Sequence, residues 1–449
     1  MRIPSWVAWA LATAALLAGC AGEDARSGDD EAAEASEAVA ATSEAPERPL
    51  LEGVAPVLLL KPAAPDFKAL PGANAHFGTL GGAAFRIEIP SNWNGELLLW
   101  AHGFRAWPET RAENPPEALR RALIDGGYAW AASSFSGNGY IPGAATNDTL
   151  ALKEHFSEQF GEPTRTYIAG GSMGGHVVAL SLENFPGEYD GGLSLCGVVA
   201  GGEWIDYQMA WTTAAEFIAG FELPRDQGPE KAAEALESKL FPALDPAGAP
   251  TEQVKAFTSV IRNLTGGHRP FFDEGYRAAF RFNFGLATGD PGRTVAYSRA
   301  ASTIGIDFQA DPGLGFDDDA INRGVRRLAP DAELRDAAKH PDTAPTTGKL
   351  RDPLLTLHES GDLTVPISME QSYRRKADAA GAGDLLVQRI IRHSGHCEFS
   401  DSEITRAWDD LTAWVSGKGR PGGDDILSDL SDAGRAYTDP LRPGDSGGK

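Results

Sequence analysis

The sequence predicts an α/β fold in which a mostly parallel sheet is flanked by helices. Short apolar runs typical of buried strands recur along the chain, and segments of helical periodicity separate several of them. Strands that alternate with helices favour a parallel sheet covered on both faces. The chain has 449 residues, and 42% of them are hydrophobic, which excludes a disordered or fibrous protein.

The expected elements begin with an alternating strand at residues 81–90, which stops at Pro90. Nearly continuous apolar runs predict further strands at residues 96–104, 127–135, 165–172, 191–197, 353–360 and 385–393. Helical periodicity predicts helices at residues 115–126, 145–161 and 174–185.

The alternation stops between residues 198 and 350, where four segments look amphipathic and helical. We therefore expect a mainly helical cap over about residues 203–345, inserted between two buried strands. Aromatic residues in and around this region are candidates for a substrate pocket and equally for internal packing. They are Trp107, Trp204, Trp211, Phe282 and Phe284.

The N-terminus has the pattern of an export signal. One charge, Arg2, precedes an apolar run too short for a stable membrane span, and Leu17-Ala18-Gly19-Cys20 resembles a bacterial lipobox. The resemblance implies that residues 1–19 are removed and that Cys20 carries diacylglycerol, which would hold the protein in the bacterial cell envelope outside the cytoplasm. The alternative is an ordinary secretory signal.

Charge and cysteine content exclude several classes of protein. The 40 basic and 63 acidic residues give a formal net charge of −23, and no basic cluster suggests a nucleic-acid partner. Three cysteines, without CxxC spacing, exclude a disulfide-dense scaffold and a cysteine-based zinc module. We expect no metal and no organic cofactor.

The two ends of the chain are expected to lie outside the fold. Residues 20–50 are rich in Ala, Glu, Asp and Ser, so they are expected to form an acidic, disordered tether. The folded domain with its cap is then expected to span residues 51–416, and residues 417–449 read as a disordered tail.

The chemistry begins at Ser172, in the sequence Gly170-Gly171-Ser172-Met173-Gly174 between an expected strand and an expected helix. Small residues on both sides allow the sharp turn that lifts a serine hydroxyl above the sheet. A serine needs a base, and His396 lies on a loop after the last strand, with His393 as its near rival.

The base needs a carboxylate to orient it, and Asp362 follows the strand at 353–360. Glu359 and Asp352 are the rivals, one still on the strand and the other before it. His102, His176 and His358 are interpreted as structural, because they lie in a turn, on a helix and inside a strand.

These motifs together resemble the α/β-hydrolase superfamily. The matching pieces are HGF at 102–104, GGSMGG at 170–175, SGDLTVP at 360–366 and SGHC at 394–397, in the order Ser, Asp, His. The resemblance implies an α/β-hydrolase fold with the cap after the sixth strand. It implies Ser172 as nucleophile, His396 as general acid and base, Asp362 as its orienting group, and the N–H groups of Phe104 and Met173 as oxyanion donors.

The pair His396-Cys397 is also similar to feruloyl esterases and tannases, where a cysteine beside the catalytic histidine is bridged to one beside the nucleophile. Here Gly171 occupies that second position, so a phenolic-ester substrate does not follow. A bridge from Cys397 to Cys196 and two free thiols both remain open.

Our leading hypothesis is a tethered serine hydrolase that cleaves small-molecule or polymer carboxylic esters through an acyl-enzyme on Ser172. The second hypothesis is a serine peptidase, of the prolyl-oligopeptidase or aminopeptidase type, since the same three residues serve amides. The third is an inactive hydrolase fold used as a binding module.

Overall fold

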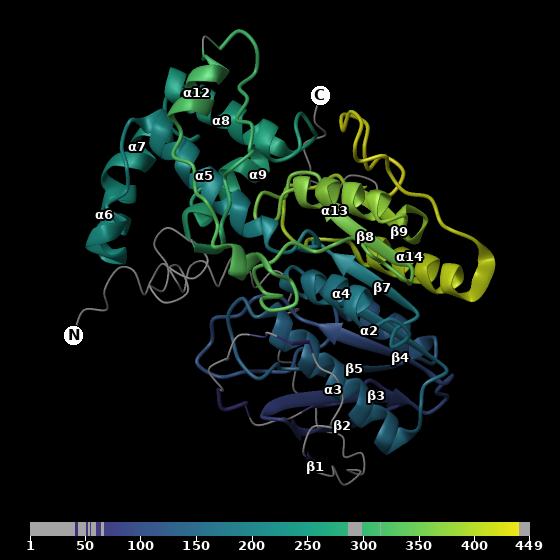
Figure 1. The fold of residues 1–449 in the computed structure, drawn as a ribbon. Helices are drawn as coiled ribbons and strands as arrows, with labels where there is room; N and C mark the ends of the chain where they lie inside the picture. Colours follow the sequence, from purple (N-terminus) through teal and green to yellow (C-terminus); the bar gives the residue numbers. More distant parts are fainter. Residues whose placement is uncertain are drawn as a thin grey trace, which may run out of the picture.

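The computed structural model describes residues 41–43, 51–52, 54, 60–63, 67–285, 299–314 and 316–439. Within these ranges, a nine-stranded sheet has the order β1-β2-β3-β5-β4-β6-β7-β8-β9 (Figure 1). Its strands are β1 (Ala41–Ser43), β2 (Ala73–Leu80), β3 (Ala83–Pro90), β4 (Glu96–Ala101), β5 (Ala129–Ser133), β6 (Arg165–Gly171), β7 (Gly191–Leu195), β8 (Leu354–Glu359) and β9 (Leu386–Ile391).

Strand direction follows the expected pattern. The pairs β2–β3 and β3–β5 are antiparallel, whereas the pairs from β5 through β4 to β9 are parallel. Every strand expected from an apolar run is present, with slightly shorter bounds. The sequence analysis did not identify β2, which forms a hairpin with β3.

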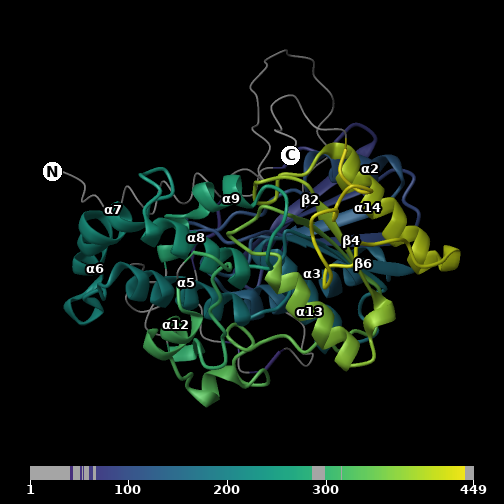
Figure 2. The same cartoon turned by 90° about the horizontal axis from the view of Figure 1, so that it is seen from above.

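The parallel strands are buried on both faces, and their alternating side chains enter two separate cores. Leu97 and Leu99 of β4 face one core, and Leu98 and Trp100 face the other. Helices α3 (Pro142–Phe160), α4 (Met173–Asn184) and α13 (Ser368–Ala379) cover the first face, while α2 (Glu117–Asp125) and α14 (Asp401–Ala413) cover the second (Figure 2). This burial explains the continuous apolar runs in the sequence.

The cap lies between β7 and β8, and β7 is the sixth strand when the short β1 is left out. Its helices gather on one side of the sheet (Figure 1). They are α5 (Glu203–Ala219), α6 (Pro229–Ala235), α7 (Phe241–Leu244), α8 (Glu252–Leu264), α9 (Phe272–Ala279), η4 (Phe282–Phe284) and α12 (Asp318–Gly324). None of the helices in the described ranges has both the length and the apolar character needed to cross a membrane.

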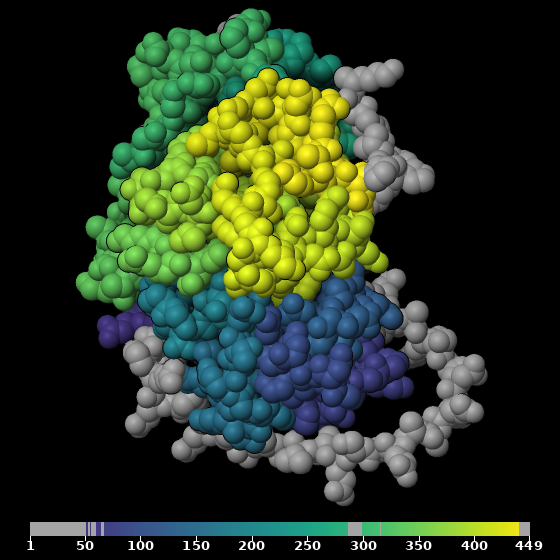
Figure 3. Space-filling model, turned by 90° about the vertical axis from the view of Figure 1, so that its right-hand side faces the viewer, coloured from purple at the N-terminus to yellow at the C-terminus, as the bar shows by residue number. Residues whose placement is uncertain are grey.

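Both expectations about the chain ends need correction. Ala41–Ser43, inside the segment expected to be a tether, pair with β2 as the parallel strand β1. The expected disordered tail packs on the protein as far as residue 439. Ile426 and Leu430 are buried against Ile367 and Ile390. We call residues 419–439 the C-terminal strap, which is part of the yellow surface in Figure 3.

The strap also covers the edge of the sheet at β9. The Asp424 N–H donates to Gln388 O at 2.8 Å, and Asp424 Oδ2 accepts the Ile390 N–H at 2.8 Å. An edge strand with free N–H and C=O groups invites pairing with other chains. The strap supplies hydrogen-bond partners for Gln388 O and the Ile390 N–H of β9. A few apolar side chains fix it to the protein.

We predict that deleting residues 420–449 destabilises the protein and makes it aggregate, because β9 and its apolar neighbours become exposed. Burial of Ile426 and Leu430 corresponds to at least about 3 kcal/mol in the free energy of unfolding. Chemical denaturation and light scattering measure the two effects. Deletion of residues 440–449 alone is the control, and equal stability of the two truncated proteins would contradict the prediction.

Candidate active site

Ser172 lies in the tight turn between β6 and α4, with backbone φ of 56°. A Cβ atom at Gly174 would overlap the Ala101 carbonyl, and one at Gly170 would overlap the Gly174 carbonyl. Glycine is therefore required at both positions for α4 to approach the sheet so closely. The turn places Ser172 at the carboxyl end of the parallel strands, at the start of α4.

The structure brings Ser172, His396 and Asp362 together in one hydrogen-bonded series. Ser172 Oγ lies 2.9 Å from His396 Nε2, and His396 Nδ1 lies 2.6 Å from Asp362 Oδ2. With Nδ1–H donating to the carboxylate, Nε2 is left to accept the serine proton. The three residues come from loops after β6, β9 and β8, because carboxyl ends of parallel strands meet at one edge.

Asp362 is buried and held in place by backbone hydrogen bonds. Its side chain is 1% exposed, and Oδ1 accepts the N–H groups of Thr364 at 2.8 Å and Val365 at 3.1 Å. One oxygen is thus fixed by the backbone, and the other faces His396.

The rival residues lie elsewhere. His393 Nδ1 accepts the Gly395 N–H at 3.1 Å and faces Glu398. Glu359 is fully buried and accepts the Glu398 N–H. Asp352 precedes β8, at the opposite end of that strand from Asp362.

The predicted oxyanion residues flank Ser172. Met173 is the first residue of α4, where N–H groups point out of the helix end. A Cβ atom at Gly103 would lie 3.2 Å from Ser172 Cβ, so the turn at 102–104 approaches the serine directly. His102 is buried, its Nδ1 lies 2.7 Å from Gly103 O, and burial lowers its pKa. A neutral His102 then donates to that carbonyl and shapes the turn.

Cys196 and Cys397 form a disulfide, with Cα atoms 5.2 Å apart. Cys196 follows β7, whose Leu195 carbonyl accepts the Ser172 N–H at 3.0 Å. The bridge therefore ties the His396 loop to the strand end that holds Ser172. A Cβ atom at Gly171 would lie 3.8 Å from Cys397 Sγ, so Cys397 lies beside the nucleophile turn although its partner is Cys196. Disulfide sulfurs are not thiolate ligands, so this cluster with His396 does not suit a metal.

Four side chains of the cap hold the loop that carries Asp362, and of these only Trp204 was a candidate from the sequence. Tyr207 Oη donates to Leu363 O at 2.6 Å, and Asn283 Nδ2 donates to the same oxygen at 2.9 Å. Trp204 Nε1 donates to Thr364 O at 2.8 Å, and Arg269 Nε donates to Ser360 O at 2.6 Å. Tyr207 and Asn283 lie in helical segments and Arg269 in the loop between α8 and α9, and no sequence motif marks these three residues.

The five candidate aromatic residues divide between packing and the site. Trp211 and Phe284 are buried in the cap core, with ring centroids 6.2 Å apart. Trp204 is half-buried, stacks on Tyr140 with centroids 5.1 Å apart, and touches the Asp362 loop. Trp107 lies under the Arg105 guanidinium, and Phe282 is half-buried on η4.

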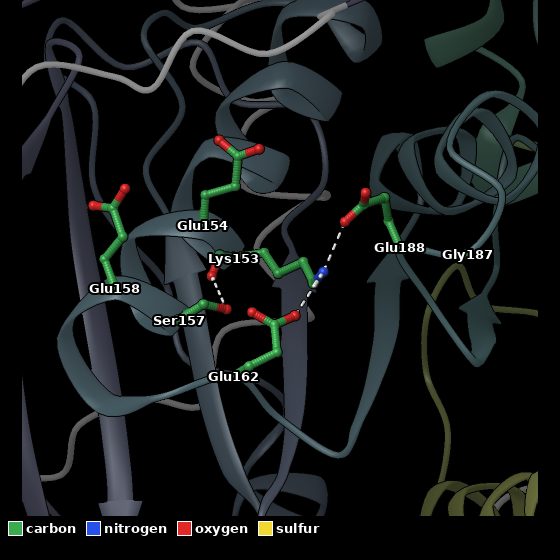
Figure 4. A pocket seen from close by; sticks show the side chains of 7 residues that line it. All are labelled: Lys153, Glu154, Ser157, Glu158, Glu162, Gly187 and Glu188. Carbon is green, nitrogen blue, oxygen red and sulfur yellow. Dashed lines mark hydrogen bonds and ion pairs between the residues drawn. The ribbon is translucent and has the colours of Figure 1, made fainter.

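A pocket of about 510 Å³ lies near the amino ends of the parallel strands β6 and β7, opposite the end where Ser172 lies. Lys153 bridges Glu162 and Glu188 across it (Figure 4). Glu162 and Glu188 immediately precede β6 and β7, whereas Ser172 follows β6, so the pocket is remote from the serine. Its acidic lining offers no nucleophile arrangement, and we assign it no role.

Comparison with known proteins gives three findings. Residues 81–209 match the Tannase-like family of unknown function (DUF6351), a segment that contains Ser172 but neither Asp362 nor His396. An o-phthalyl amidase of Xanthobacter agilis is 21% identical over 396 residues, which cover 73% of this chain and 83% of that protein.

Solved structures with similar folds include esterases and peptidases. An esterase of Pyrococcus furiosus is 9% identical and has a TM-score of 0.40, with 82% of this chain and 100% of that chain covered. A proline iminopeptidase-related protein of Thermus thermophilus is 17% identical and has a TM-score of 0.36, with 77% and 98% covered.

We predict that replacing both Cys196 and Cys397 with serine lowers the free energy of unfolding by about 3 to 5 kcal/mol, because the bond closes a long loop. The two cysteines are 201 residues apart. Denaturant unfolding of the variant, compared with the protein before and after treatment with a reducing agent, measures the effect. Unchanged stability in both comparisons would contradict it.

Proposed function

The chain has the α/β-hydrolase fold, and from this premise we propose that it is a serine hydrolase that cleaves carboxylic esters through an acyl-enzyme on Ser172. The observation that carries the proposal is the series Ser172 Oγ, His396 and Asp362, joined at 2.9 and 2.6 Å. A serine with its base, and a base with its orienting carboxylate, form the arrangement that activates a hydroxyl.

The geometry gives each group one task. Ser172 Oγ attacks the ester carbonyl while its proton passes to His396 Nε2. Asp362 keeps the ring in the tautomer that has a free Nε2, and it stabilises the imidazolium that forms. His396 then gives the proton to the leaving alcohol, and water attacks the acyl-enzyme with His396 again as base. The products are one acid and one alcohol, and Ser172 is restored.

The negative oxygen of the tetrahedral intermediate needs fixed donors. The N–H groups of Phe104 and Met173 are the proposed pair, because both belong to backbone that adjoins Ser172. These two N–H groups belong to a turn and to the start of α4. Packing fixes both segments, so little reorganisation accompanies the reaction.

Amide hydrolysis is the second candidate function. It is favoured by the similarity to an o-phthalyl amidase over most of both chains. The same residues would serve an amide or a peptide, with the amine as leaving group. Substrate class then depends on the groups between the cap and the Ser172 edge, where Trp204 and Tyr140 stack.

We predict that Ser172→Ala abolishes labelling by a fluorophosphonate probe and lowers ester hydrolysis by at least about 10⁴-fold, since it removes the hydroxyl that pairs with His396 Nε2. The assay is a panel of p-nitrophenyl esters of rising chain length beside aminoacyl anilides and phthalyl amides. Ser181→Ala, a buried serine on the same helix, is the control.

The outcomes separate the candidates. Hydrolysis that survives Ser172→Ala would overturn the proposal. A preference for anilides or phthalyl amides would favour the amidase or peptidase, and a folded natural protein that neither labels nor hydrolyses would favour a binding module.

We also propose that the protein is a lipoprotein of the bacterial cell envelope, anchored outside the cytoplasm by a lipid on Cys20. The supporting pattern is Leu17-Ala18-Gly19-Cys20 after an apolar run, in a part of the chain that lies outside the described residues. The Cys196–Cys397 disulfide is compatible with an oxidising compartment.

We predict that Cys20→Ala moves the protein from the membrane fraction to the soluble fraction of a bacterial host, because the lipid attachment site is lost. Cell fractionation and intact-mass spectrometry measure the change. A mature natural protein with an unmodified Cys20 would contradict the lipid anchor and favour a secretory signal.

A further inference from the structure

A second histidine lies behind the carboxylate that orients His396. His358 is on β8, its side chain is completely buried, and its Nε2 donates to Val365 O at 2.7 Å. The same nitrogen lies 3.8 Å from Asp362 Oδ2, the oxygen that accepts His396 Nδ1–H. Asp362 is therefore flanked by two imidazole rings, one on the serine side and one on the interior side.

The other face of His358 meets a second buried carboxylate. Nδ1 lies 3.3 Å from Glu370 Oε1 on α13. Glu370 Oε2 accepts Thr356 Oγ1–H at 2.9 Å and Gln388 Nε2–H at 2.5 Å. Glu370 is completely buried, and a buried carboxylate is stable where donors or a cation face its oxygens. His358 Nδ1 is the group that faces Oε1.

We propose that His358 is held as an imidazolium between Asp362 and Glu370, and that it acts as a positioning residue that keeps His396 unprotonated and able to act as a base. This inference rests on the proposed function. His358 touches neither the serine nor a substrate, so its effect reaches the reaction only through Asp362 and its charge.

The surrounding charges agree with this assignment. Burial alone lowers the pKa of His358, but the interaction with Glu370, together with the charge of Asp362, raises it to about 9. Burial raises the pKa of Glu359 well above its ordinary value, and the charge of Asp362 raises it further. The other charged or titratable groups facing Asp362 are Arg269 and Tyr207 of the cap.

A positive charge on His358 affects His396 in one direction only. A positive charge on the far side of Asp362 opposes a second positive charge on His396 through Coulomb repulsion. The general base must be neutral to accept the Ser172 proton, and protonation of His396 limits activity at low pH. The proposed imidazolium thus extends activity toward acidic pH, and its removal should shorten that range.

The test is the pH profile of kcat/KM for the full chain with a p-nitrophenyl ester. For His358→Gln, which keeps a donor near Val365 O but carries no charge, we expect the acid limb to move up by about half a pH unit or more. Activity one unit below the natural limb then falls about threefold. Glu370→Gln should move the limb in the same direction by less, because it removes the partner that keeps His358 charged.

His155→Gln is the matched control, since His155 is a buried histidine of α3 that packs on Phe85. We expect it to leave the limb in place. An unmoved limb in His358→Gln, or movement to lower pH, overturns the role of His358 while labelling of Ser172 still supports the proposed function. Survival of hydrolysis in Ser172→Ala is the separate result that removes the function itself.

A measurement on the natural protein covers the case in which the variants do not fold. With ¹⁵N-labelled histidine, NMR at pH 7 reports the protonation of each ring nitrogen. We expect both nitrogens of His358 to carry protons. A bare nitrogen on His358 would overturn the inference regardless of the activity.

Discussion

Everything at the reactive edge depends on the close approach of α4 to the ends of the strands. Ser172 has a left-handed backbone conformation, which costs a side-chain-bearing residue about 1 to 3 kcal/mol. Three backbone hydrogen bonds hold it there: its N–H to Leu195 O, and its carbonyl to the N–H groups of Gly175 and Val198. Cβ atoms at Gly174 or Gly175 would collide with neighbouring backbone, so the approach and the turn fail together.

The cap belongs to the same unit as the reactive edge. Its buried donors satisfy the carbonyls of Ser360, Leu363 and Thr364, all in the loop that carries Asp362. A cap that swung away as a rigid lid would break these hydrogen bonds, each worth about 0.5 to 1.5 kcal/mol net of bonding to water. The contacts therefore favour a cap that stays packed on the Asp362 loop.

Sequence alone predicted the elements whose identity depends on local pattern. Runs such as the one in β4 are buried on both faces, so they stand out, and Ser172, His396 and Asp362 follow from motifs at strand ends. Strand β2 was not predicted because most of it is only partly buried, and Asn74, His76 and Thr79 interrupt its apolar residues. The packing of the strap was not predicted, because only a few apolar side chains within a polar segment fix it to the protein.

Other features depend on contacts between distant parts of the chain. Tyr207, Asn283 and Arg269 look like ordinary cap residues, and their contacts with the Asp362 loop exist only after folding. The pairing of Cys196 with Cys397 was one of two open alternatives, because a sequence does not show which loops adjoin. His358 was interpreted as structural, since nothing in a strand pattern shows two carboxylates around it.

The disulfide has a consequence for biosynthesis. Its partners are 201 residues apart, and the closed loop contains the cap, β8 and β9. During translation Cys196 emerges long before Cys397, so it passes through synthesis without its native partner. The bond that ties the His396 loop to β7 forms only after nearly the whole chain is available. Covalent closure of the reactive edge therefore follows synthesis of the cap, β8 and β9, and it requires an oxidant.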